Sequence, residues 1–289
     1  MKHLAFLLTA LLSASASVAL AQAGGTYTTI DFPGATSTVA EGIDSAGDVV
    51  GYFVDSGGVF LHGFLLSNGV YTQLDAPGTT NGTIAYGIND VGQVVGTAAG
   101  SAFFVYDIPT QSWATYTYPN NNYQTATGIN NSGLIVGWAS DIPAHGYIGL
   151  ELMGSTFKQV NVPNVPDTQL TSVNDSGAVV AVASYGVHHP ISYLGNGGTF
   201  ERIVVPGFPN AYAVAINDSN VLAGEYFTKR DSAFEWQRMG LFKPINESKQ
   251  VNTHANGINS TGQVVGFYND GSTTQNHGLL WTPPAPQKK

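Results

Sequence analysis

The sequence has no cysteine and little charge. The absence of cysteine excludes disulfides, thiolate nucleophiles, Cys-ligated zinc and a lipidated N-terminal cysteine. Ten Lys and Arg stand against 19 Asp and Glu, a formal net charge of −9, so the chain lacks the basic footprint that nucleic-acid binding requires. Charged residues make up only 10% of the chain. The low charge content and the acidic excess therefore argue against a protein that binds nucleic acid.

Several catalytic signatures are also missing. The chain has no HExxH, no G-x-S-x-G, no phosphate loop and no G-x-G-x-x-G. The sequence therefore gives no support to a zinc protease, a serine hydrolase of the α/β type or a nucleotide-binding enzyme. From the sequence we assign no catalytic residue, no metal ligand and no cofactor.

What the chain does contain is apolar residues, glycine and proline. Hydrophobic residues make up 43%, including 14 Phe, 14 Tyr and 4 Trp, beside 35 Gly and 14 Pro. This composition can bury a sizeable core, so we predict a folded protein and not a disordered one.

The first 21 residues read as a secretory signal peptide. Lys2 and His3 give a short basic start, Leu4 to Leu12 are apolar, and small residues end at Ala21. The apolar run of about nine residues is short against the ~20 that span a bilayer, so we expect no membrane span. We predict cleavage after Ala21 and a secreted, extracellular or periplasmic protein.

One ten-residue motif occurs six times. Its third residue, Asp or Asn, recurs at spacings of 41 to 45 residues, which indicates a repeat architecture. The copies are GIDSAGDVVG (42–51), GINDVGQVVG (87–96), GINNSGLIVG (128–137), SVNDSGAVVA (172–181), AINDSNVLAG (215–224) and GINSTGQVVG (257–266).

Each copy has the pattern of a β-hairpin. The Asn or Asp opens a turn, and Gly follows three positions later, as from Asn89 to Gly92, where the turn needs a left-handed residue. The fifth copy has Asn220 in place of Gly, and Asn is the other residue that tolerates positive φ. For the Gly that ends each VVG strand, such as Gly51, we predict a close approach of neighbouring backbone.

The rest of each unit adds two further strands. Alternating segments such as VYTQLD (70–75) precede a Pro-Gly turn in most copies, and apolar segments such as HGFLL (62–66) follow the hairpin. Units of about 43 residues with four strands match the blades of a β-propeller. A solenoid is the alternative, but its coils are usually shorter and lack tight hairpins.

We therefore predict an all-β, six-bladed β-propeller. The array starts with the strand that elsewhere ends a unit, so Thr26 to Asp31 should complete the last blade and close the ring. The expected organisation is a signal peptide (1–21), a linker (22–25), the propeller domain (26–283) and a C-terminal tail (284–289).

With these motifs in place, the chain resembles the extracellular HAF-repeat proteins. The repeat name is echoed by His62-Gly63-Phe64, His145-Gly146-Tyr147 and His277-Gly278-Leu279, and is degraded in the other copies. The resemblance covers nearly the whole mature chain. It implies a secreted, repeat-built protein and brings no catalytic residue with it.

Histidines and carboxylates give weak functional signals. Because His62, His145, His189 and His277 hold equivalent places in different blades, we expect them to be spread around the ring and not to share a metal. Turn chemistry accounts for the carboxylates of the hairpins, which are Asp44, Asp90, Asp175 and Asp218. Calcium is possible at the loops 55–58 and 269–272, although solvated turns explain them as well.

Charge is unevenly distributed along the chain. Residues 24–155 contain ten acidic and no basic residues, whereas residues 156–289 contain nine of each. Lys229 and Arg230 belong to a charged cluster after the fifth hairpin, and a polar loop on a propeller rim is a place where partners dock.

The loops that we expect between blades carry aromatic and amide residues, among them Tyr123, Tyr212 and His254. Such residues suit sugars, because ring faces stack on sugars and amides pair with hydroxyls. The candidate ligand-binding residues are Tyr123, Tyr212, His254, Lys229 and Arg230. We predict a monomeric, non-catalytic binding module for an extracellular polysaccharide or protein. The alternative is a glycan hydrolase or lyase with carboxylates near the propeller axis.

Overall fold

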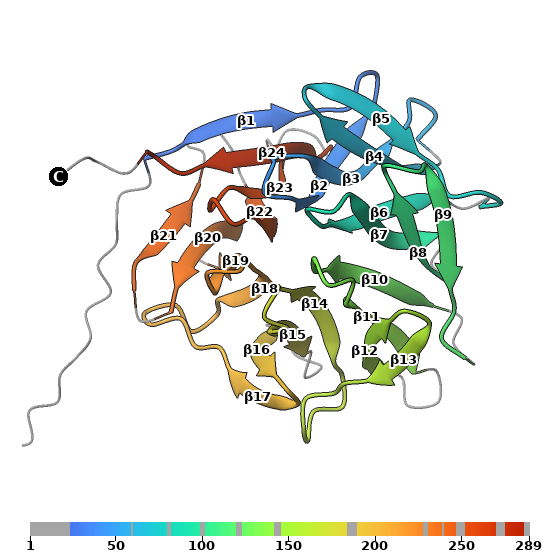
Figure 1. The fold of residues 1–289 in the computed structure, drawn as a ribbon. Helices are drawn as coiled ribbons and strands as arrows, with labels where there is room; N and C mark the ends of the chain where they lie inside the picture. Colours follow the sequence, from blue (N-terminus) through green and yellow to red (C-terminus); the bar gives the residue numbers. More distant parts are fainter. Residues whose placement is uncertain are drawn as a thin grey trace, which may run out of the picture.

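The chain folds into six antiparallel sheets of four strands each, arranged as a ring around a central axis (Figure 1). This confirms the six-bladed β-propeller. The computed structural model describes residues 24–58, 60–79, 82–98, 102–119, 123–141, 146–183, 190–227, 231–238, 240–246, 252–269 and 275–285. Within these ranges, no helix has the length and apolar character needed to cross a membrane.

The first three blades follow one another along the chain, each running from its innermost to its outermost strand. Blade 1 comprises β2 (Ser37–Ile43), β3 (Val49–Val54), β4 (Leu61–Ser67) and β5 (Val70–Leu74). Blade 2 comprises β6 (Thr83–Ile88), β7 (Gln93–Ala98), β8 (Ala102–Asp107) and β9 (Ser112–Tyr116). Blade 3 comprises β10 (Gln124–Ile129), β11 (Ile135–Asp141), β12 (Gly146–Met153) and β13 (Thr156–Gln159).

The last three blades repeat this order, and the sixth takes its outermost strand from the N-terminus. Blade 4 comprises β14 (Gln169–Val173), β15 (Val179–Ala183), β16 (Ile191–Asn196) and β17 (Thr199–Arg202). Blade 5 comprises β18 (Tyr212–Ile216), β19 (Val221–Phe227), β20 (Asp231–Gln237) and β21 (Phe242–Ile245). Blade 6 comprises β22 (Asn252–Ile258), β23 (Val264–Asn269), β24 (His277–Thr282) and β1 (Thr26–Ile30).

The predicted ring closure is present. Strand β1 pairs antiparallel with β24, with Thr26 opposite Thr282 and Ile30 opposite Gly278. The pairing joins the two ends of the chain in one sheet, so β24 is not left as an open edge.

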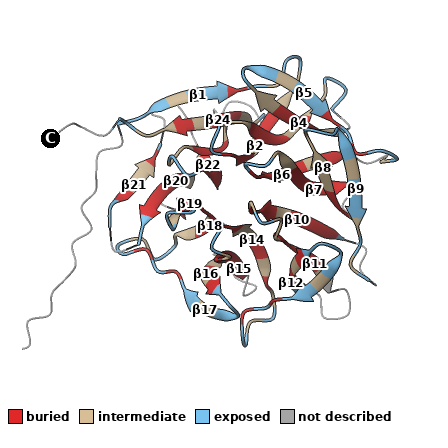
Figure 2. Cartoon of the chain, in the orientation of Figure 1, coloured by how far each residue is buried: buried red, intermediate tan, exposed pale blue. Residues whose placement is uncertain are grey.

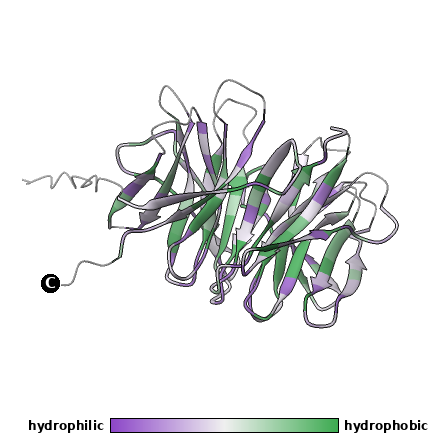
Figure 3. Cartoon of the chain, turned by 90° about the horizontal axis from the view of Figure 1, so that it is seen from above, coloured by the Kyte–Doolittle hydropathy of each residue, from purple (hydrophilic) through white to green (hydrophobic). Residues whose placement is uncertain are grey.

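The core lies between adjacent blades. One apolar cluster, for example, joins Leu65 and Leu74 of blade 1 to Ala85 and Phe104 of blade 2. Figure 2 shows burial falling from the inner strands to the outermost ones. In Figure 3, hydrophobic residues gather in the strands and hydrophilic residues at the turns. Each blade is therefore stabilised mainly by apolar burial against its two neighbours.

The hairpins have the predicted turn geometry. The Gly92 N–H donates to the Asn89 carbonyl at 3.1 Å, and Gly92 has φ of +85°. Asn220 takes the same place in blade 5 with φ of +57°. The close approach predicted at the VVG glycine is also confirmed, since a Cβ on Gly51 would collide with the carbonyl oxygen of Val39.

Candidate functional site

The axial channel is lined by the six innermost strands, and every one of them carries a β-bulge. The register slips by one residue at the same place in each blade. Bulges re-aim side chains and are frequent next to functional sites. The bulged residues are Glu41, Tyr86, Thr127, Thr171, Val214 and Asn256.

A ring of branched apolar side chains divides the channel into two halves. These residues line both halves and are 4–8% exposed. They are Ile43, Ile88, Ile129, Val173, Ile216 and Ile258. We call the end with the inner hairpin turns the turn face, and the end where the inner strands begin the link face. Each half holds about 80 Å³, enough for a few water molecules and too little for a sugar chain.

In the link-face half, several side chains have already used their donors on backbone carbonyls. Thr127 Oγ1 donates to the Leu170 carbonyl at 2.6 Å, and Thr171 Oγ1 donates to the Val180 carbonyl at 3.3 Å. Asn256 Nδ2 donates to the Ala40 carbonyl at 3.0 Å. The two threonine hydroxyls therefore offer the channel acceptors only, whereas Asn256 keeps its carbonyl oxygen and one amide N–H.

Among the described residues that line this half, Glu41 is the one acidic residue. Its side chain is half-buried, and its carboxyl lies deep among protein atoms. Burial raises the pKa of Glu41 to about 8, and no hydrogen bond or opposite charge counteracts it. Burial and then Glu41 also raise the pKa of Tyr52 to about 12, and the same causes raise the pKa of Tyr86. A carboxyl perturbed in this way inside a cavity is a candidate functional group.

At the turn face, asparagines join each blade to the next. The side-chain amide of the third motif residue donates to the backbone carbonyl of its equivalent in the following blade, at 2.8–3.1 Å. These five links start from Asn89, Asn130, Asn174, Asn217 and Asn259. The turn residues therefore act between blades as well as within them, which the sequence interpretation did not foresee.

The sixth link is missing because blade 1 has Asp44 at this position, and a carboxylate has no N–H to donate to Asn89. Its Oδ1 accepts the Asp48 N–H at 2.8 Å, as the asparagine Oδ1 accepts the equivalent N–H in the other blades. Burial, with a contribution from the charges of Asp48 and Asp90, raises the pKa of Asp44 above its ordinary value.

We expect Asp44→Asn to stabilise the protein. The new amide can complete the ring, which is worth about 1 kcal/mol and roughly 2–4 °C in Tm. Because the folded-state pKa of Asp44 is raised, the wild type loses stability as pH rises through that pKa, so the gain should be larger at pH 7 than at pH 4. Thermal denaturation at both pH values measures it; an equal or lower Tm at pH 7 would contradict the missing-link interpretation.

A second, more exposed series of hydrogen bonds, which we call the outer ring, runs beside the first through blades 1 to 5. The Ser45 N–H donates to Asp90 at 2.9 Å, Asp90 N–H to Asn131 at 2.8 Å, and the pattern continues to Asp218. Burial opposes ionisation of Asp90, but hydrogen bonds from Ser45 and Asn131 hold the pKa of Asp90 below its ordinary value. The carboxylates of this series accept backbone N–H groups from the turn of the preceding blade, so they have a structural role at the hairpin turns.

Two of the predicted ligand-binding residues meet at the link-face end of the inner strands. His254 Nδ1 lies 3.0 Å from Glu225 Oε1, and Tyr212 also hydrogen-bonds Glu225. The sequence predicted that Tyr212 and His254 lie in loops, and this is wrong. Tyr212 lies in β18, where it pairs with Glu225 of β19, and His254 lies in β22, where it pairs with Phe267 of β23.

Glu225 controls the ionisation of both partners. Burial and then Glu225 raise the pKa of Tyr212. Burial alone would lower the pKa of His254, but the hydrogen bond and charge of Glu225 raise it above its ordinary value. Each ring is also stacked, His254 on Phe267 with centroids 4.3 Å apart and Tyr212 on Phe227 at 5.8 Å. The cluster is polar on one side and aromatic on the other.

The remaining predicted residues are not brought together with this cluster by any described contact. Tyr123 is 63% exposed and directly precedes β10, so it lies on the link face. Lys229 and Arg230 lie outside the described residues, as does most of the 269–272 loop proposed for calcium. Within the described part of the chain, no three His, Asp or Glu side chains are grouped to hold a metal ion.

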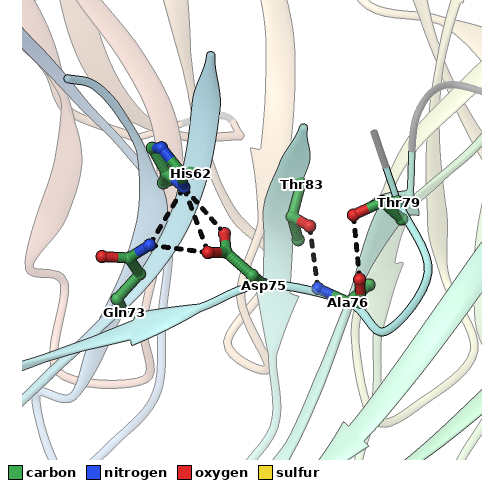
Figure 4. A network of polar contacts seen from close by, with 6 residues as sticks. All are labelled: His62, Gln73, Asp75, Ala76, Thr79 and Thr83. Carbon is green, nitrogen blue, oxygen red and sulfur yellow. Dashed lines mark hydrogen bonds and ion pairs between the residues drawn. The ribbon is translucent and has the colours of Figure 1, made fainter. Parts of the chain in front are cut away.

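Two HGF-type histidines, His62 and His277, have local partners. His62 Nδ1 lies 3.0 Å from Asp75 Oδ1 and also contacts the Gln73 amide (Figure 4). His277 Nδ1 lies 2.9 Å from Asp31 Oδ2 in the closing strand of blade 6. His62 and His277 thus bond locally, each within its own blade. His145 and His189 lie outside the described residues.

Comparisons with known proteins support the fold more than any activity. Residues 65–145 match the family model described as a protein of unknown function (DUF3466). No curated protein matches the chain. Several solved propeller structures are similar to this chain at low sequence identity.

A putative gluconolactonase is 14% identical, with a TM-score of 0.56 over 91% of this chain and 94% of that one. A gluconolactonase of Xanthomonas campestris is 14% identical, with a TM-score of 0.55 over 90% of each chain. Virginiamycin B lyase of Staphylococcus aureus is 11% identical, with a TM-score of 0.53 over 91% of this chain and 90% of that one. At such identities the likeness shows the propeller fold alone.

Proposed function

We propose that this protein is an exported binding module that holds an extracellular polysaccharide on the link face of the propeller. The observation that carries the proposal is the meeting of Tyr212 and His254, from neighbouring blades, on the buried carboxylate of Glu225. Export, through a signal peptide cleaved after Ala21, and kinship with the HAF-repeat proteins are parts of the same proposal.

The link face suits a hydroxyl-rich ligand for two reasons. Aromatic rings stack on the apolar faces of sugars, while carboxylates and imidazoles pair with hydroxyls. The channel half behind the face is too small for a sugar chain, so the chain would lie across the face with at most one substituent in the channel. The exposed ring of Tyr123 on the same face would extend the surface.

The test is binding by the mature chain, starting at Gln22, to a panel of soluble polysaccharides. A ligand at 100 times its Kd should stabilise the protein by about 2.7 kcal/mol, a Tm shift of several degrees. An EDTA arm reports any calcium requirement. We expect Tyr212→Ala and His254→Gln each to weaken binding roughly tenfold, since each removes a bond to a charged group or a stacking face.

Tyr116→Ala, on the outermost strand β9, is the matched control and should leave the affinity unchanged. Equal affinities for the wild type and both link-face variants would refute the assignment of the site. A protein partner is the remaining ligand class if no polysaccharide binds.

An enzyme is the second candidate, because Glu41 is an unpartnered carboxyl whose pKa of about 8 suits general acid–base catalysis near neutral pH. Glu41 has no second carboxyl beside it among the described residues that line its half of the channel. The carboxylates that line the turn-face half, Asp44, Asp90, Asp175 and Asp218, belong to the hairpin turns, and three of them accept hydrogen bonds between blades. Two similar structures are named as gluconolactonases, so lactones are the first substrates to assay. Turnover that disappears in Glu41→Gln would favour this candidate over binding alone.

A further inference from the structure

The link-face half of the channel is rich in oxygen acceptors. Its bulged residues contribute the Glu41 carboxyl, the Tyr86 hydroxyl and the oxygens of Thr127, Thr171 and Asn256. Both threonine hydroxyls donate to backbone carbonyls, of Leu170 and Val180, and one N–H of Asn256 donates to the Ala40 carbonyl. A ligand group that enters here therefore meets oxygen acceptors from several blades, and donors of its own can pair with them.

The charge of this half-channel points the same way. No Lys, Arg or His is among the residues that line it. The groups that face Glu41 electrostatically are two phenols, Tyr52 from β3 and Tyr86 from β6, and both are neutral near pH 7. The other inner strands contribute the neutral residues Thr127, Thr171, Val214 and Asn256. Among the described residues that line this half, the Glu41 carboxyl thus has no positively charged partner.

We propose that this half-channel is a receptor for a primary ammonium group, and that the ligand held on the link face is an amine-bearing sugar. The proposal rests on the proposed function, because it names the class of sugar that the link face would hold. An ammonium has three N–H donors and one positive charge, which match three or more oxygen acceptors around a single carboxylate.

Size and charge favour an ammonium over a metal ion. The half-channel of about 80 Å³ has room for an amino group on one carbon and not for a sugar ring. Divalent calcium takes six to eight oxygens and usually several carboxylates, whereas this site has one. The described residues also contain no group of three acidic or histidine side chains suited to a metal. Residues 24–155, with ten acidic and no basic residues, would attract a cationic polymer.

The proposal predicts proton release. At pH 7 the Glu41 carboxyl is mostly protonated, and an ammonium that binds it displaces the proton to solvent. Calorimetry of glucosamine binding in two buffers of different ionisation enthalpy should give close to one proton released per ligand. The affinity should fall by up to about tenfold per pH unit between pH 8 and pH 6, because protons compete for Glu41.

The specificity test compares glucosamine with glucose, and ethanolamine with both. We expect glucosamine to bind at least about tenfold more tightly than glucose, and Glu41→Gln to remove this preference through a loss on the order of 10- to 100-fold. Glu201→Gln is the control. It makes the same change of charge at an exposed carboxylate paired with Arg238, and should keep the preference.

Four outcomes are decisive. Equal affinity for glucose and glucosamine, or a preference that survives in Glu41→Gln, would overturn the ammonium receptor. Binding of K⁺ or Ca²⁺ that depends on Glu41, without any binding of amines, would also overturn it. If ethanolamine binds with proton release but no polysaccharide binds, the receptor stands and the polysaccharide function fails. Proton release is measured on the wild type, so the test does not depend on the folding of a variant.

Discussion

Replacing Glu41 by Gln is expected to stabilise the free protein strongly at alkaline pH and to change little at pH 4.5. Burial raises the pKa of Glu41 from 4.5 to about 8, so folding favours the protonated carboxyl. The wild type therefore carries no penalty below pH 4.5, loses stability as pH rises from 4.5 to 8, and has the full penalty above pH 8. Gln cannot ionise and escapes this loss.

The gain should be on the order of 2–4 kcal/mol at pH 9, because each pKa unit corresponds to ~1.4 kcal/mol and the half-buried side chain is partly screened by solvent. Denaturant unfolding at pH 4.5, 7 and 9 measures it. Tyr52 and Tyr86 stay neutral in this range, since their pKa values are raised. The exposed control Glu201→Gln should show no such gain. If both variants behave alike, Glu41 is solvated in the folded protein and the burial argument fails.

The fold could be predicted because the same repeat motif occurs six times in the sequence. Each copy joins a period-two apolar pattern to a turn that needs a left-handed residue, as at Gly92 and Asn220, and both lie at positive φ. The order of strands also indicated the closing role of β1, which pairs with β24. Local rules were sufficient here, because every blade obeys the same ones.

The site could be predicted only in part, because its contacts join different blades. Tyr212 and His254 were singled out by residue type, but their common partner Glu225 lies in β19 and meets His254 across a blade boundary. Glu41 was counted only among the acidic residues. A signal was available: the residue just before each motif varies as Glu41, Tyr86, Thr127, Thr171, Val214 and Asn256. A variable position in a strict repeat indicates side chains that the fold itself does not require.

For the hairpin asparagines, the sequence predicted the role within the turn but not the role between blades. Turn chemistry explained their presence in each hairpin, and in the structure they do form the turns. Local rules could not indicate that Asn130 Nδ2 would reach the Asn174 carbonyl of the next blade, because that bond depends on how closely the inner strands approach the axis. The same residue type thus serves both the turn and the ring.

Truncation of one link in the buried ring, Asn130→Ala, is expected to destabilise the protein by about 3–4 kcal/mol. Asn130 is 4% exposed, its Oδ1 accepts from the Leu134 N–H and from both donors of Ser132, and its Nδ2 donates to Asn174. Alanine leaves those groups without their partner in a buried place. Thermal and denaturant unfolding should show a Tm lower by roughly 6–15 °C.

Asn131→Ala is the matched control, since it removes the same side chain one residue later. Asn131 bonds Asp90 and Asp175 in the exposed outer ring, where water can replace the lost partners, so its cost should stay below about 1 kcal/mol. A large difference between the two variants means that the buried asparagine ring, and not turn propensity, stabilises the junctions between blades. Equal losses would show that the links across the blades contribute little and that apolar packing alone holds the ring closed.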